Sequence, residues 1–149
     1  MTTHYAGTET EKRALDTFIK LSRAAESVNR RVNEHLRAHD LSVSQFGVLE
    51  ALYHLGPLPV GQVADKILRS SANLTLVVDN LDKRGLVARR RRADDRRTVE
   101  VSLTEAGAAL TAAIMPAHVA GVVAAFAVLP PEEQATLAAL CRKLGLAVE

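Results

Sequence analysis

Six arginines and two aspartates occupy eight of the nine positions from Arg89 to Arg97. Arginine is favoured where a side chain enters the narrow, electronegative minor groove of a DNA duplex. An adjacent aspartate can hold such an arginine in place through a forked hydrogen bond. The run therefore predicts DNA contacts by arginines such as Arg89 and Arg91, with a solvated charged turn as the alternative.

The segment before this run predicts a polar helix face that suits the major groove. Helical spacing predicts a buried side made of Leu74, Val77, Val78 and Leu81. The outward or flanking positions are then Ser71, Asn73, Thr75, Leu76 and Asn80. An asparagine amide can pair with adenine, hydroxyls can meet phosphates or base edges, and a leucine can touch a thymine methyl. Together with Arg69 and Ser70, these residues form the predicted recognition face; the alternative is an ordinary exposed helix.

The distribution of charge favours a polyanionic partner. The chain carries +2 overall, yet residues 65–97 hold ten basic and five acidic side chains, a local charge of +5, and the remainder sums to −3. Each phosphate that a cation neutralises releases condensed counterions, which favours binding to duplex DNA. The sequence shows no nucleophile–base set, phosphate-binding glycine loop or paired-acid arrangement, so we expect neither an enzyme nor a cofactor.

The bulk composition indicates an ordinary globular chain. Its 149 residues are 48% hydrophobic and 24% charged, which fits one structural domain. The single cysteine, Cys141, excludes an internal disulfide and fits a reducing compartment, and the first residues lack the pattern of a signal peptide. We therefore expect a cytoplasmic protein in which Cys141 is a buried structural residue.

A mainly helical framework must position these segments. Apolar spacings of three and four residues predict one long helix over about residues 10–39, whose stripe needs a second subunit to cover it. Further helices are predicted from Ser42 or Ser44 to about Gly56, at 60–68 (with Val63, Ala64 and Ile67 inward), from Ser70 or Ser71 to Gly85, after Thr104, and at 132–144. Period-two alternation predicts strands at 86–88 and 99–103. The resulting hairpin follows a helix-turn-helix and forms a wing.

Residues 106–129 carry no formal charge with His118 neutral, and their length permits a membrane span. The segment is mostly Ala, Gly, Val and Thr and contains Pro116, so it lacks the Leu, Ile and Phe content that favours insertion. A helix that is apolar all round can also be buried within protein. We therefore expect a dimer core and no membrane partner.

Four motifs in one continuous run carry a family resemblance. They are the stretches VGQVAD at 60–65, LDKRGLV at 81–87, Asp95-Arg96-Arg97 and VSLTEAG at 101–107. In this order they resemble the MarR family of transcriptional regulators, and the flanking helices fit the remainder of the chain. The chain departs from many relatives at Leu76, where they carry a basic or polar residue, and at Pro130, where a helix-capping serine is common.

The resemblance implies a winged helix-turn-helix fold, mainly α with a small β-wing and with long N- and C-terminal dimerisation helices. Its parts would be a dimerisation helix at 1–40, a DNA-binding lobe at 41–104 and dimerisation helices at 105–149. The implied function is a homodimeric repressor that binds a pseudo-palindromic operator in double-stranded DNA; the alternative is a non-specific architectural DNA-binding protein. The implied wing contacts are Arg96 and Arg97, supported by Asp95.

Members of the family often release DNA when a small organic anion binds near the junction of the dimer and DNA lobes. His35, His39 and Tyr53 are the residues that we expect to contact such an effector. His35 and His39 are four apart on the predicted first helix, so they would share a face. A metal site there would need further ligands, for which Asp40, Glu34 and His54 are the candidates, and we expect none.

Overall fold

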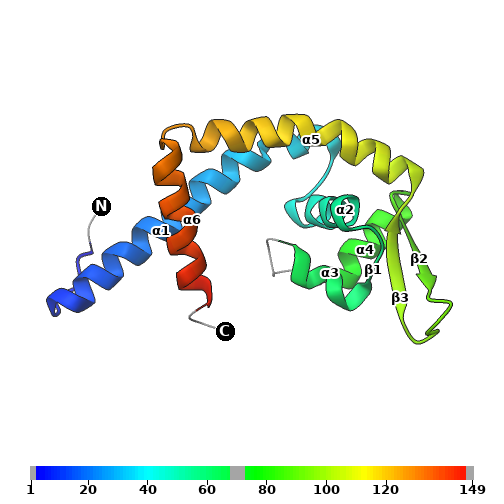
Figure 1. Ribbon diagram of the computed structural model, residues 1–149, viewed down its shortest axis with the longest axis horizontal. Coiled ribbons are helices and arrows are strands. Elements are labelled where there is room, and N and C mark those ends of the chain that lie inside the picture. The colour runs from blue at the N-terminus through cyan, green and yellow to red at the C-terminus, as the bar shows by residue number, and fades with distance from the viewer. Residues whose placement is uncertain (1–2, 68–72, 147–149) are drawn as a thin grey trace. The chain divides into compact units, whose positions relative to one another are not determined.

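The computed structural model describes residues 3–67 and 73–146 (Figure 1). Its order of elements is α1 (Glu9–Asn33), the 3₁₀ helix η1 (Glu34–His39), α2 (Val43–Leu55), β1 (Leu58–Pro59), α3 (Val60–Lys66), α4 (Leu74–Lys83), β2 (Val87–Arg91), β3 (Val99–Leu103), α5 (Glu105–Phe126) and α6 (Pro131–Leu146). The chain forms two compact units: residues up to Glu34 with those from Val119, and residues His35–His118.

Reciprocal capping boxes start the first two helices. The Thr8 hydroxyl accepts from the Glu11 backbone N–H, and the Glu11 carboxylate accepts from the Thr8 N–H. Ser42 and Gln45 exchange the same pair of bonds at the start of α2. Gly56 ends α2 with a positive φ of 77°, a conformation that glycine adopts without strain. Of the two predicted caps, Ser42 and Ser44, Ser42 is the one that caps α2, and the predicted end near Gly56 is confirmed.

The last six residues of the predicted first helix form η1, a 3₁₀ helix. With about 3.0 residues per turn, positions four apart lie about 120° apart around the axis. The prediction that His35 and His39 share a face is therefore wrong. It assumed the wider α-helical turn, in which positions four apart are neighbours.

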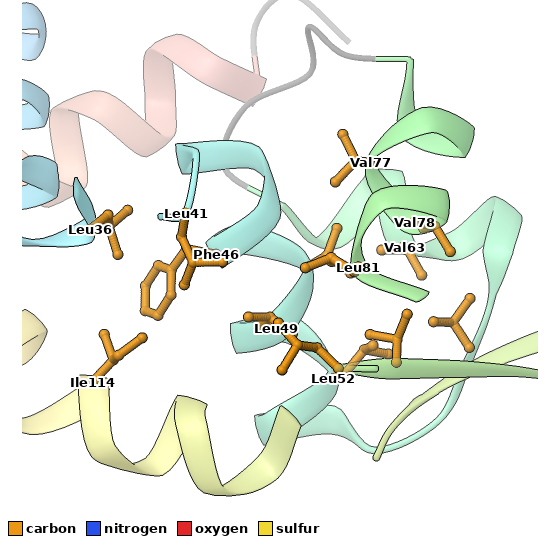
Figure 2. Packing of buried hydrophobic residues seen from close by; sticks show 14 residues of the cluster. Leu36, Leu41, Phe46, Leu49, Leu52, Val63, Val77, Val78, Leu81 and Ile114 are labelled. Atoms are coloured by element: carbon orange, nitrogen blue, oxygen red, sulfur yellow. The ribbon is translucent and has the colours of Figure 1, made fainter. Parts of the chain in front are cut away.

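The second unit has one hydrophobic core (Figure 2). Phe46, Leu49 and Leu52 of α2 lie at its centre, where Leu81 of α4 approaches from one side and Ile114 of α5 from another. Each of these five side chains is at most 3% exposed. Val63, Val77, Val78, Val87 and Val101 extend the core to α3, α4 and the sheet. This core fixes α4 and the strands, which carry the predicted DNA contacts, to α2.

The helix-turn-helix is built by α3 and α4, with two corrections. Within α3, Val63 is buried as predicted and Ile67 is half-buried, but Ala64 is exposed because α3 ends at Lys66, after fewer than two turns. Asn73 caps α4, since its side-chain oxygen accepts from the Leu76 backbone N–H at 3.3 Å. The predicted caps Ser70 and Ser71 lie outside the described residues, and the helix starts later than they imply.

Three antiparallel strands form the sheet in the order β1-β3-β2. The predicted hairpin is confirmed, with Val87 opposite Leu103, Arg89 opposite Val101, and Arg91 opposite Val99. Its first strand, predicted at 86–88, instead runs from Val87 to Arg91, so the first arginines of the run lie in β2 and not in the turn. The sequence analysis missed β1, whose residues Leu58 and Pro59 pair with Val101 and Glu100. Two residues, one of them a proline, carry no periodicity of their own, and their pairing depends on β3.

The start of α5 is fastened to the turn between α4 and β2. The Thr104 hydroxyl accepts from the Gly107 N–H at 3.0 Å, as predicted for a cap, and donates to the Gly85 carbonyl at 2.6 Å. The Thr104 N–H donates to the Leu86 carbonyl at 3.1 Å. A Cβ at Gly107 would lie 1.9 Å from that same oxygen, so only glycine fits this approach. The VSLTEAG motif thus joins the end of β3 and the start of α5 to the turn between α4 and β2.

The first unit exposes much apolar surface. All described residues of α6 are exposed, and the exposed large apolar side chains of the unit include Phe18, Val123, Val128, Leu137, Leu140, Leu144 and Leu146. Cys141 is exposed as well, so the expectation of a buried cysteine is wrong for the single chain, in which nothing covers α6. Among the described residues, α5 alone has the length and hydropathy of a membrane span. Its buried Thr111 and Ile114, however, face the core of the second unit.

Candidate nucleic-acid interface

The predicted recognition face occupies the start of α4. Asn73, Thr75 and Leu76 are exposed, while Val77, Val78 and Leu81 are buried, so the division between outward and inward residues is confirmed. Leu76, with 53% of its surface exposed, is the large apolar side chain on this face. Asn80 is half-buried, and Arg69, Ser70 and Ser71 lie outside the described residues. The face therefore offers an amide, a hydroxyl and an apolar group at a helix N-terminus.

The strand register divides the arginines of the wing between two faces. Arg89 and Arg91 lie opposite Val101 and Val99, and Arg90 lies opposite Glu100. Successive side chains of a strand point to opposite faces of the sheet. Because Val101 is fully buried, Arg89 leaves β2 on the face toward the core, and Arg90 leaves it on the other. The hairpin of β2 and β3 projects from the helical part of this unit (Figure 1).

Two aspartates shape the loop of the wing. Asp95 accepts from the Arg97 backbone N–H at 3.0 Å and from the Thr98 hydroxyl at 3.2 Å, so it fixes the turn rather than a guanidinium. The forked pair lies elsewhere: Nε and Nη2 of Arg92 each donate to an oxygen of Asp94 at 3.0 Å. These bonds lower the pKa of Asp94 and raise the pKa of Arg92. Arg92 also lies 3.3 Å from Glu100.

Three wing arginines are left without a protein partner. Within the described part of the chain, no hydrogen bond or ion pair engages the side chains of Arg90, Arg96 and Arg97, and all three residues are exposed. Arg91 donates from Nη1 to the Arg96 carbonyl at 2.8 Å, which fixes the backbone beside these cations. Arg96 and Arg97 were predicted to contact DNA, whereas Arg90 was not. The alternation of side chains along a strand could have identified Arg90, because it places Arg90 on the face opposite to that of Arg89 and Arg91.

Arg89 is engaged by α4 itself. Its Nη2 donates to Asp79, and its Nε and Nη2 lie 3.4 and 3.3 Å from Asp82. The hydrogen bond from Asp79 is the main reason why the pKa of Arg89 is raised. A second tie comes from Arg84, at the end of α4, which donates to the carbonyls of His39 and Asp40 at 3.1 and 2.7 Å. The C-terminal half of α4 is thus bound both to β2 and to the end of η1.

The predicted effector residues are only partly brought together. His35 lies in a ring cluster with Phe46 and His118, at centroid distances of 6.2 and 5.2 Å. Nε2 of His35 and Nδ1 of His118 are buried, and within the described part of the chain neither has a hydrogen-bond partner. Tyr53 contacts His54 instead, and among the described residues no ring contact or hydrogen bond joins Tyr53 or the His39 side chain to the cluster. His118, which closes the cluster from α5, was missed because its contact is made across more than 80 positions of the chain.

Burial lowers the pKa of His118, and the neighbouring His35 acts in the same direction, whereas Glu50 opposes them. Burial beside these neighbours therefore favours the neutral imidazole of His118. Across the described residues, no group of three or more histidines, cysteines and carboxylates is placed to bind a metal ion. The cluster thus combines three ring contacts with two buried imidazole nitrogens.

Comparisons with known proteins agree with this architecture. Residues 41–99 match the model of the MarR family. The chain is 40% identical to the HTH-type transcriptional regulator MhqR of Bacillus subtilis, over 92% of this chain and 94% of the relative. It is also 33% identical to the regulator YkoM of the same organism, over 93% of this chain and 90% of the relative.

Solved structures show the same fold. The structure of BpsR from Bordetella bronchiseptica superposes with a TM-score of 0.77 at 26% identity and covers 97% of this chain and 98% of that one. AbsC of Streptomyces coelicolor, a MarR family regulator, superposes with a TM-score of 0.80 at 22% identity, over 98% of both chains. The mainly helical winged helix-turn-helix is therefore confirmed. The structure has a helix-turn-helix with an exposed recognition face and a wing that bears arginines, and the relatives match over nearly their whole length. The chain therefore belongs to the MarR family and is a DNA-binding transcriptional regulator.

Proposed function

We propose that this regulator is a homodimeric repressor that binds a pseudo-palindromic operator through α4 and the wing. The observation that carries the proposal is the pairing, within one compact unit, of the exposed face Asn73–Leu76 with unpartnered Arg96 and Arg97. A helix of this kind enters the major groove, and arginines of a projecting hairpin suit the adjacent minor groove. Asp95 supports the wing by shaping its turn.

Dimer formation is supported by the apolar surface of the first unit. Phe18 is 65% exposed on α1, Val123 is 64% exposed on α5 and Leu140 is 59% exposed on α6. Several large apolar side chains exposed on one unit favour an interaction site there. A second copy of the chain would cover it, and the dimer's two-fold axis would match half-sites about one helical turn apart.

Footprinting on the DNA upstream of the regulator's own gene tests the proposal. We expect a protected pseudo-palindrome bound at least about 10³-fold more tightly than random duplex at the same salt concentration. A ratio near one would instead identify a non-specific architectural DNA-binding protein. Sedimentation of the free protein checks the dimer; a monomer at the concentrations that protect DNA would refute the two-fold arrangement.

We further propose that a small organic anion with an aromatic ring releases the operator. In BpsR, 6-hydroxynicotinic acid regulates DNA binding. In this chain, the unpartnered nitrogens of His35 and His118 beside the ring of Phe46 would suit a molecule with a ring and a polar substituent. His39 and Tyr53 stay candidates for its outer contacts, although they lie outside the ring cluster.

A thermal-shift screen with hydroxylated aromatic acids tests this second step, since a molecule that binds the native dimer raises its melting temperature. We expect a hit to lower operator affinity, and His35→Ala and His118→Ala to abolish both effects. Tyr53→Phe and His39→Ala test the proposed outer contacts, and we expect them to weaken the response less than the cluster variants do. An undiminished response in both His35→Ala and His118→Ala would remove the cluster from the proposal.

A further inference from the structure

Arg89 differs from the other wing arginines because two carboxylates of the recognition helix hold it. Its Nη2 donates to Asp79, and its Nε and Nη2 both reach Asp82 within 3.4 Å. By contrast, Arg90 next to it and Arg97 in the loop have no protein partner among the described residues. Two of the three guanidinium nitrogens of Arg89 are therefore directed at α4 rather than at solvent.

The fold dictates this direction. Arg89 lies opposite the fully buried Val101, so the pleat places its side chain on the face of the hairpin that packs toward the core. Asp79 and Asp82 are three apart on α4 and so lie on one side of that helix. The side chain of Arg89 is about one-third exposed, at 34%, and fills the space between the wing strand and these carboxylates.

We infer that Arg89 is a positioning residue that locks the wing strand to the recognition helix, so that α4 and the wing loop meet DNA in one fixed arrangement. The two ion pairs also offset part of the negative charge of Asp79 and Asp82, on a helix that must approach phosphates. This inference rests on the proposed DNA contacts of α4 and the wing. It reassigns Arg89 from contacting DNA to orienting the residues that do.

A positioning residue and a phosphate contact respond differently to substitution. Loss of a phosphate contact weakens operator and random duplex alike and reduces the magnitude of the salt slope, d log K/d log[salt], by about 0.9. Loss of positioning weakens operator binding selectively, because only specific binding requires α4 and the wing to be in register with each other. A substitution that merely unfolds part of the protein reduces both affinities by the same factor and leaves their ratio unchanged.

The experiment measures the affinity of the full-length protein for operator and for random duplex across a salt series. For Arg89→Ala we expect operator affinity to fall about three- to tenfold, because two partly exposed ion pairs are lost, with the salt slope within about 0.3 of the wild-type value. Arg90→Ala is the matched control on the same strand. It should reduce both affinities together if Arg90 contacts phosphate, and neither if it does not.

Arg89→Lys provides a second variant that keeps the charge. Lysine serves a phosphate as a point charge, but it cannot span Asp79 and Asp82 with a fork. We therefore expect Arg89→Lys to resemble Arg89→Ala in its reduced operator-to-random ratio, and the charge swap Arg89→Asp with Asp79→Arg to recover part of that ratio.

Wild-type binding with no operator preference would refute the proposed function itself, before any variant is compared. A wild-type preference that Arg89→Lys preserves in full, or a loss of about 0.9 in salt slope for Arg89→Ala, would overturn the positioning role alone. An equal loss on both duplexes with an unchanged slope would reduce Arg89 to a stability residue and would likewise overturn it.

Discussion

Gly107→Ala tests the joint between α5 and the wing. The added Cβ would lie 1.9 Å from the Leu86 carbonyl oxygen and 3.3 Å from the Leu103 side chain. Because carbon–oxygen contacts ordinarily begin at about 3.3 Å, the start of α5 must retreat by about 1.4 Å. That movement breaks the bonds from Thr104 to the carbonyls of Leu86 and Gly85.

The magnitude follows from these contacts. Two hydrogen bonds contribute about 1 kcal/mol each, and residual overpacking costs about 1 to 2 kcal/mol more. Alanine recovers about 1 kcal/mol through its higher helix propensity. We therefore expect Gly107→Ala to lower the free energy of unfolding by about 2 kcal/mol.

Urea unfolding followed by circular dichroism, at one fixed protein concentration, measures the effect. Gly61→Ala is the matched control, since Gly61 is also helical and a Cβ there meets nothing within 4 Å. It should raise stability by about 0.5 kcal/mol. A Gly107→Ala midpoint at or above that of Gly61→Ala, with equal m-values, would refute the steric account of the motif.

Three further outcomes are expected. Arg97→Ala should weaken operator and random duplex alike and lower the salt slope by about 0.9, as gel shifts at several salt concentrations would show; an unchanged slope would argue against a phosphate contact. Leu81→Ala should destabilise the fold by about 3 kcal/mol because Leu81 is fully buried, whereas the exposed Leu76→Ala should stay within about 0.5 kcal/mol and change operator affinity instead. Burial lowers the pKa of His118 below its ordinary 6.5, so the unfolded chain binds more protons, and stability should fall as the pH drops from 6.5 toward the folded-state pKa. His118→Gln should flatten that dependence in melts between pH 5 and 7.5, and an equally steep profile would contradict the assignment to His118.

Local patterns were sufficient to predict most of the fold. The cap at Ser42, the cap at Thr104 and the hairpin around the arginine run each depend on residues within a few positions of one another. The start of α4 could not be predicted in this way. Asn73 caps the helix, although serines, such as the nearby Ser70 and Ser71, cap helices equally well. Local chemistry leaves that choice open, and the packing of α4 decides it.

Features made by distant residues could not be predicted. Leu58 and Pro59 become a strand only because β3 offers an open edge, and His118 joins His35 only because α5 packs against the core. The 3₁₀ turn that separates His35 from His39 is also invisible in a periodicity that both helix types satisfy approximately. The effector proposal depends on His35, His39 and His118. The sequence could identify candidates for an effector site, but it could not show how these three residues are arranged.

The arginine run shows why charge counting underdetermines function. Arg89, Arg92 and Arg97 belong to one stretch and carry the same charge, yet their partners differ. Arg89 binds Asp79 of α4, and Arg92 binds Asp94 and Glu100. Arg97 has no side-chain partner among the described residues. The pleat sends Arg89 toward the core face, and the turn fixed by Asp95 presents Arg97 at the loop. A net local charge of +5 therefore overstates the cations that are available to DNA, since some already neutralise carboxylates within the lobe. The number of phosphate contacts should follow the unpartnered arginines rather than the composition, and the salt slope measures that number directly.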